Sequence, residues 1–148
     1  MPAPAPAYTE KFSVAARDYA AAGEVSAKVK SILRKIGIDP ALIRRITIAA
    51  YEAEINMIIH SFGGVITLEI TPDEVYISCD DTGPGIEDIE LAMQEGYSTA
   101  PTSIRMMGFG AGMGLSNIKK NSDVFDITSS KEGTSLKLRF NIGVPNEP

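Results

Sequence analysis

The sequence of 148 residues contains no tryptophan, one cysteine and one histidine. A single cysteine excludes a disulfide framework and a cysteine-based zinc site, and a single histidine argues against a histidine-rich metal site. No apolar run reaches the roughly 18 residues of a membrane span, and the N-terminus lacks the pattern of a signal peptide. Basic residues number 14 against 19 acidic ones, which disfavours general nucleic-acid binding. We therefore expect a cytoplasmic protein that contacts neither membrane nor nucleic acid directly.

The length and the two ends of the chain predict one domain with flexible termini. About 150 residues suit a single domain with its own core. Residues 1–7 alternate proline with alanine, and residues 143–148 contain two prolines and a glycine. Such segments favour extended, solvated chain. We expect an arm at 1–7, a single domain at 8–142 and a tail at 143–148.

Helical periodicity is clearest in two segments of the first half. Apolar residues recur at helical spacing from Val25 to Ile36, and Gly37 follows as a stop. Pro40 suits a first helical turn, and a long helix is predicted from Ala41 to His60. A short helical stretch is expected near 86–94, and another helix is expected to open at 115–120.

Alternating residues predict five strands, so the expected fold class is α+β. The segments are 8–16, 66–70, 75–81, 124–130 and 134–142, the last four forming two hairpins. We expect a two-layer sandwich in which helices cover one face of a mixed, mostly antiparallel sheet.

The long helix carries the first candidate site. Glu52 and Asn56 are four residues apart and share one helical face, with His60 in the same row, whereas Glu54 lies on the opposite side. A carboxylate and an amide placed in this way can hold a hydrated divalent cation or polarise a water molecule. The alternative is a polar stripe at the edge of a buried helix.

The second candidate follows a predicted strand. Strand alternation places Asp81 on the apolar side, where a carboxylate needs a hydrogen-bond donor. That donor is either a backbone amide of the following turn or a ligand. Gly83 and Gly85 in this turn let a flat ligand approach the backbone, although a plain strand-to-helix turn would look the same.

Glycines dominate the third candidate, in which Gly108, Gly110, Gly112 and Gly114 alternate before Leu115. Free amides at the start of a helix favour an anion, although a flexible hinge has the same composition. Neither the dinucleotide-binding nor the Walker pattern fits, because no strand precedes the glycines and no Lys-Ser/Thr follows them.

Taken in order, the three motifs resemble the nucleotide-binding fold of the GHKL ATPases over roughly residues 8–142. The stretch from Asp81 to Thr99 and the segment Asn56–His60 are most similar to the switch kinases and anti-sigma serine kinases of bacterial partner-switching pathways. The chain has no room for the transducer domain of gyrase-like members, and its one histidine lies in the long helix rather than on a phosphoacceptor helix. Residues 100–107 depart from the switch-kinase pattern.

The resemblance implies ATP and Mg²⁺ as cofactors and a role for each motif. Asn56 would ligate Mg²⁺, and Glu52 would act on the attacking group as base or water-positioner. Asp81 would accept from the adenine amino group. The remaining binding residues implied are Gly83 and Gly85 beside the base, Gly110, Gly112 and Gly114 around the phosphates, Leu115 packed in the core, and Arg105, which either reaches the γ-phosphate or is a solvated loop residue.

Two functions remain open on this basis. The first is an ATP-dependent serine/threonine-protein kinase and anti-sigma-type factor that phosphorylates a small antagonist protein and binds a sigma factor or a phosphatase as its other partner. The second is a module whose bound ATP gates its grip on such a partner, with little or no catalysis. The presence of both Glu52 and Asn56 favours the enzyme, because a module that only binds ATP needs no more than contacts to adenine and phosphate. A homodimer is also compatible with the resemblance.

Overall fold

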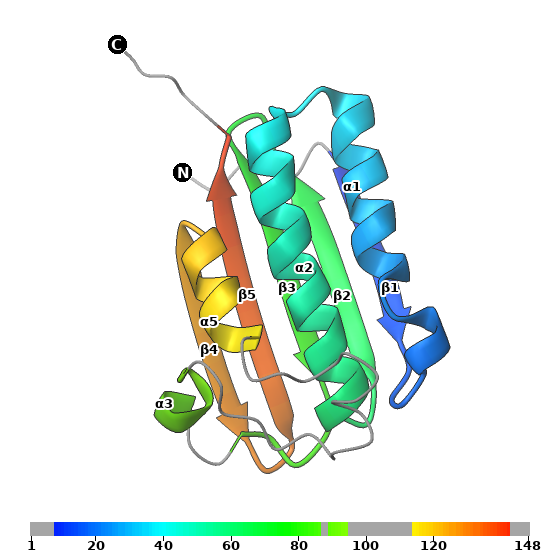
Figure 1. Ribbon diagram of the computed structural model, residues 1–148, viewed down its shortest axis with the longest axis vertical. Coiled ribbons are helices and arrows are strands. Elements are labelled where there is room, and N and C mark those ends of the chain that lie inside the picture. The colour runs from blue at the N-terminus through cyan, green and yellow to red at the C-terminus, as the bar shows by residue number, and fades with distance from the viewer. Residues whose placement is uncertain (1–7, 87–88, 95–113, 143–148) are drawn as a thin grey trace, which may run out of the picture.

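The computed structural model of the chain describes residues 8–86, 89–94 and 114–142 (Figure 1). The expected arm at 1–7 and tail at 143–148 therefore lie outside the described residues. So do three candidate site residues, Arg105, Gly110 and Gly112.

Five strands form one sheet in the spatial order β1-β2-β3-β5-β4. The strands are β1 (Tyr8–Val14), β2 (Gly64–Ile70), β3 (Glu74–Asp81), β4 (Val124–Ser130) and β5 (Gly133–Asn141). The predicted strands and both predicted hairpins are present, with ends that differ by one or two residues. The expected α+β class is thereby confirmed.

The pairing differs from the expectation in one respect, because all four pairs in the described sheet are antiparallel rather than mixed. Two helices lie between β1 and β2, so the chain returns to the end of the sheet where β1 finished and runs back along it. β3 and β4 run in the same direction, but β5 is inserted between them and is antiparallel to both (Figure 1). A parallel pair would have required a single crossover helix between neighbouring strands.

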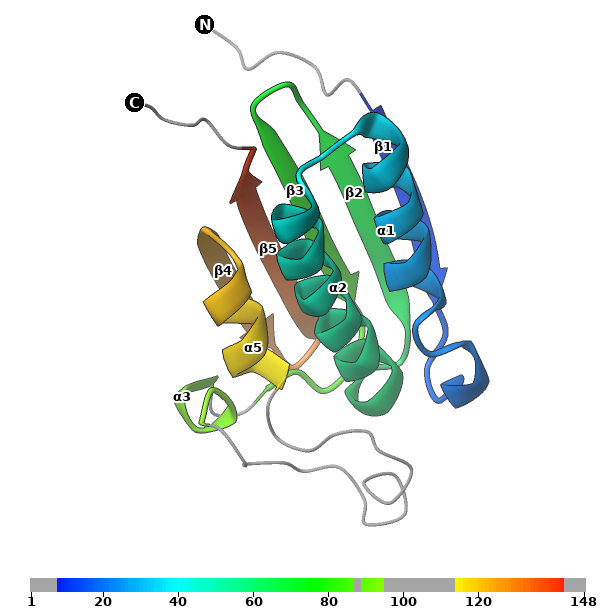
Figure 2. The same cartoon turned by 45° about the horizontal axis from the view of Figure 1, so that its top comes forward.

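The helices form a second layer over one face of the sheet (Figures 1 and 2). This layer consists of α1 (Glu24–Ile36), α2 (Pro40–His60) and α5 (Gly114–Asn121), with the short elements η1 (Tyr19–Ala21) and α3 (Ile89–Ala92) at its margin. Asp39 caps α2 by accepting hydrogen bonds from the backbone N–H groups of Ala41, at 3.0 Å, and Leu42, at 3.3 Å. Gly37 ends α1 in the left-handed conformation, as its position predicted.

The core lies between the two layers. Alternate strand residues such as Ile66, Leu68, Ile77 and Phe140 are almost completely buried in this core. Cys79 belongs to the same layer, and burial raises the pKa of its thiol to about 12, so it is an inert core residue. None of the described helices combines the length and the apolar character needed to cross a membrane.

Candidate nucleotide site

The second half of α2 carries Glu52 and Asn56 on one face, as their spacing predicted, and that face is turned towards α5. Both side chains are half-buried. Glu52 accepts a side-chain hydrogen bond from Asn117 of α5. Burial raises the pKa of Glu52 above its usual range, and the hydrogen bond from Asn117 opposes that rise. This contact was not predicted, because Asn117 belongs to none of the three sequence motifs.

The first residue of α5 lies directly against Asn56. A Cβ placed on Gly114 would come within 3.1 Å of Asn56 Oδ1 and 3.2 Å of Asn56 Nδ2. A side chain at this position would therefore require the Asn56 amide to shift by a few tenths of an ångström. The structure thus brings the helix motif and the end of the glycine motif together, although they are 58 positions apart in the chain. Leu115, the next residue, is buried in the core as expected.

Asp81 ends β3 on the face of the sheet that carries the helices, where alternation placed it. The backbone N–H of Thr134 donates to Asp81 Oδ1 over 2.9 Å, and Oδ2 has no hydrogen bond to a described residue. Burial raises the pKa of Asp81, the hydrogen bond from Thr134 lowers it, and the neighbouring charge of Asp80 raises it again. The donor comes from the β4–β5 hairpin rather than from the turn after Asp81.

Gly85 is needed for the close approach of two loops. Its φ of +76° suits glycine, and an added Cβ would lie 2.0 Å from the carbonyl oxygen of Ser130. At Gly83 a Cβ would lie 3.2 Å from the Cα of Ser61. Both glycines therefore have a packing reason of their own, beside the ligand approach that the sequence suggested.

The C-terminal end of α2 is held by Arg17. The Arg17 guanidinium donates to the carbonyl oxygens of Ile58, at 3.0 Å, and Ser61, at 3.2 Å. Its own φ of +65° is uncommon for a residue with a side chain. His60 is the last residue of the helix and is exposed. Arg17 lies 41 positions before Ile58, so no local sequence signal connects the two.

Groups that can hold a metal ion are sparse in the described part of the chain. No three His, Cys, Asp or Glu side chains come together within residues 8–86, 89–94 and 114–142. The Asn56 amide oxygen is the one predicted metal ligand, and it lies beside the start of α5.

The chain belongs to a known family of nucleotide-binding proteins, because residues 15–140 match the histidine kinase-like ATPase domain. ATP use is a property of this family, and the predicted GHKL resemblance is confirmed. A solved structure that contains the RsbU and RsbW domains of Rv1364c from Mycobacterium tuberculosis has the same fold, with a TM-score of 0.65 at 20% identity. It matches 95% of this chain, which spans about a third (34%) of that longer chain.

Curated relatives within this family are serine/threonine-protein kinases and anti-sigma factors. The chain is 30% identical over 113 residues to the serine/threonine-protein kinase RsbT of Bacillus subtilis, covering 73% of this chain and 79% of that protein. It is 33% identical over 116 residues to the anti-sigma F factor of Clostridium beijerinckii, covering 71% and 78% respectively. These relatives confirm the predicted function class, an ATP-dependent serine/threonine-protein kinase of the anti-sigma type.

Proposed function

We propose that this chain transfers the γ-phosphoryl group of ATP to a serine or threonine hydroxyl of a small antagonist protein in a partner-switching pathway. A sigma factor or a phosphatase would be its alternative partner. The observation that carries the proposal is the contact between α2 and α5, where Glu52, Asn56 and the helix N-terminus at Gly114 lie together. A carboxylate, a hard amide ligand and free backbone amides are the groups that phosphoryl transfer needs.

The residues present fit a Mg²⁺-bound triphosphate. An amide oxygen such as Asn56 Oδ1 suits a hard cation, and the beginning of α5 suits an anion. When bound, Mg²⁺ would neutralise charge on the phosphates. Asn56 would hold the ion, and Gly110, Gly112 and Gly114 would line the triphosphate, with Arg105 at the γ-phosphate. These roles follow the family resemblance. For Gly114, the contact with Asn56 also supports the proposed role.

Glu52 is proposed as the group that receives the proton of the attacking hydroxyl. Its half-buried position and its contact with Asn117 fix the carboxylate beside Asn56, within the same face of α2. A serine hydroxyl becomes a better nucleophile when a positioned carboxylate accepts its proton. The bond from the γ-phosphorus to the bridging oxygen of ATP breaks as the new bond to the serine oxygen forms, and ADP leaves.

Asp81 is proposed to select adenine. Thr134 occupies Oδ1 and orients the carboxyl group, so Oδ2 is left to accept from an exocyclic amino group. A guanine would present a carbonyl oxygen at the same place, and two acceptors would repel. Because Gly83 and Gly85 have no side chains, they would let the adenine ring pack against the backbone of this loop.

The kinase proposal is tested with γ-labelled ATP, Mg²⁺ and candidate antagonist domains from the same genome. Label should appear on a partner serine or threonine and should vanish in Glu52→Ala, while ATP still binds. Glu24→Ala, an exposed carboxylate at the start of α1, is the matched control and should leave labelling unchanged. If partners are never labelled but complexes form only with nucleotide, the ATP-gated binding module is correct instead.

The adenine assignment is tested by nucleotide titration of Asp81→Asn. Affinity for ATP should fall at least about tenfold, since the amide would present a donor in place of an acceptor or lose its orientation. Asp80→Asn is a close control, because Asp80 is the exposed neighbour that accepts from Ser135 Oγ at 2.8 Å. Equal affinities for the two variants would refute the role of Asp81.

A further inference from the structure

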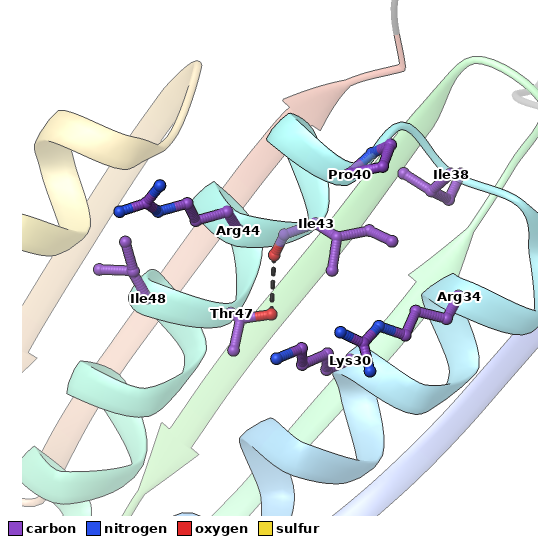
Figure 3. A pocket seen from close by; sticks show the side chains of 8 residues that line it. All are labelled: Lys30, Arg34, Ile38, Pro40, Ile43, Arg44, Thr47 and Ile48. Carbon is purple, nitrogen blue, oxygen red and sulfur yellow. Dashed lines mark hydrogen bonds between the residues drawn. The ribbon is translucent and has the colours of Figure 1, made fainter.

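A groove lies between α1 and α2 at the end of the helix layer away from the nucleotide site. Its volume is about 740 Å³. It is lined by Lys30, Arg34, Ile38, Pro40, Ile43, Arg44, Thr47 and Ile48. Figure 3 shows Lys30 and Arg34 reaching from α1 towards α2, whereas Ile38 lies in the turn between the helices and Pro40 begins α2. The proposed kinase uses none of these residues.

The floor of the groove is apolar and recessed. Ile38 and Ile43 are buried at 9% and 5% exposure, and Ile48 is half-buried. The hydroxyl of Thr47 is turned back to the Ile43 carbonyl oxygen, 2.7 Å away, so the wall presents no free polar group at that point. Because the isoleucines of this floor are recessed, an apolar side chain from another molecule can enter the groove and contact them.

The rim of the groove carries charge of one sign. Residues 28–45 contain six basic residues and a single acidic one, in a chain whose net charge is −5. That acidic residue, Asp39, already accepts two backbone hydrogen bonds at the start of α2. Among the residues that the structure describes, Lys30, Arg34 and Arg44 have no ion pair and no side-chain hydrogen bond. Lys30 and Arg34 thus stand on α1 and Arg44 projects from the opposite side of α2 (Figure 3), and none of them has a counter-charge among the described residues.

We propose that this groove docks an acidic amphipathic helix of a separate protein. Lys30 and Arg34 are one turn apart on α1, and Arg44 and Ile48 are one turn apart on α2. Carboxylates spaced i, i+4 on a third helix would match the spacing of these cations, and apolar residues between them would meet the isoleucines. The groove between two packed helices is also the shape that receives a third.

Two other polyanions suit the groove less well. A nucleic-acid backbone has no apolar ridge to place on the isoleucine floor. An anionic membrane is bound through apolar side chains that insert into it, whereas Ile38 and Ile43 are recessed below the rim. The recessed apolar floor therefore favours a protein helix over the other two polyanions.

The test uses a synthetic helical peptide of about 18 residues, with leucines on one face and glutamates beside them, and its counterpart with glutamine for every glutamate. The wild-type protein should bind the acidic peptide by fluorescence anisotropy, at least about tenfold more tightly than the glutamine peptide, and more weakly as salt rises. The Lys30→Glu/Arg34→Glu variant should lose at least about tenfold in affinity. Isoleucine methyl signals of Ile43 and Ile48 should shift on binding.

The matched control is Lys11→Glu/Lys137→Glu, which makes the same change of charge at exposed strand residues. It should bind the acidic peptide as the wild type does. An equal loss in both double variants would overturn the proposal, because binding would then reflect net charge alone. So would a failure of the acidic peptide to bind, or tighter groove-dependent binding of a DNA duplex or of phosphatidylserine vesicles. Equal thermal midpoints for the two double variants show that the comparison is between folded proteins.

Discussion

The buried carboxylate of Glu54 accepts a hydrogen bond from the backbone N–H of Gly23, 3.1 Å away, at the beginning of α1. It also accepts from the N–H groups of Val25 and Ser26, both at 3.2 Å. Gly23 offers no side-chain cap to its own helix. The cap of α1 is therefore supplied by a residue of α2. Burial raises the pKa of Glu54, and the three backbone hydrogen bonds oppose that rise.

Replacing Glu54 should destabilise the fold without touching the nucleotide site. Glu54→Gln can accept only through one oxygen and turns an amide donor towards N–H groups, so we expect a loss of about 1–3 kcal/mol in the free energy of unfolding. Urea denaturation at neutral pH measures it. Glu24→Gln changes an exposed carboxylate in the first turn of the same helix and should cost about 0.5 kcal/mol or less. Equal losses in the two variants would show that Glu54 does not act as the cap.

Glu52, on the opposite face of α2, is predicted to have the opposite effect on stability. Burial raises the pKa of Glu52 in the folded protein, so the stability linked to its protonation is complete below the unfolded pKa, about 4.3, and is lost as pH rises through the folded pKa. Because glutamine does not ionise, the Glu52→Gln variant does not lose stability as the pH rises through that pKa. The variant should be equal to or more stable than the wild type at pH 7, by less than about 1 kcal/mol, and the difference should vanish near pH 4.

Urea denaturation at both pH values checks this prediction. A clear loss of stability in Glu52→Gln at pH 7 would mean that Glu52 is a structural residue. A stable but inactive variant would have the property expected of a functional carboxylate held in a partly desolvated site.

The sequence predicted the elements of this fold well, because their signals are local. The periodicity of α2, the glycine after α1 and the alternation of β2 and β3 each depend on neighbouring residues. The same holds for the shared face of Glu52 and Asn56, which needs only the pitch of a helix. Contacts between distant segments were not predicted: Thr134 with Asp81, Asn117 with Glu52, and Arg17 with the end of α2. They depend on how elements pack, and no spacing in the chain encodes them.

Asn117 should tune the acidity of Glu52. Its hydrogen bond lowers the pKa of Glu52, so Asn117→Ala should raise that pKa further. If Glu52 must be ionised to accept a proton, the acid limb of the pH–rate profile for phosphoryl transfer should move to higher pH, with activity recovered above it. Asn121→Ala is the control on the same helix, since Asn121 donates to the carbonyl oxygen of Asn117. An unmoved acid limb in Asn117→Ala would contradict the assignment of Glu52 as base.

Gly85 and Gly37 allow the cost of close packing to be separated from the cost of a positive φ. Both have φ values near +80°, at +76° and +89°. A Cβ on Gly37 meets nothing within 4 Å, whereas one on Gly85 lies 2.0 Å from the Ser130 carbonyl oxygen. Gly37→Ala should cost about 1 kcal/mol through the backbone alone, and Gly85→Ala should cost at least about 2 kcal/mol more. Thermal unfolding of the two variants measures the difference, and similar costs would mean that the two loops can separate freely.

Gly114→Ala should separate nucleotide binding from stability. Alanine favours a helix over glycine by up to about 1 kcal/mol, so the variant should unfold no more easily than the wild type. Its Cβ would lie 3.1 Å from Asn56 Oδ1, and the amide must move to accommodate it. We expect affinity for ATP in the presence of Mg²⁺ to fall about tenfold or more, and the dependence on Mg²⁺ to weaken.

A double-mutant cycle with Asn56 shows whether Gly114→Ala weakens ATP binding by displacing the Asn56 amide. In a double-mutant cycle with Asn56→Ala, a Gly114→Ala substitution has no amide to displace, so its effect on Mg²⁺-dependent ATP affinity should largely disappear. Isothermal titration with Mg²⁺ and with EDTA gives the four affinities needed. Fully additive losses would show that the new methyl group obstructs the nucleotide directly, and Asn56 would then lose its assignment as the metal ligand.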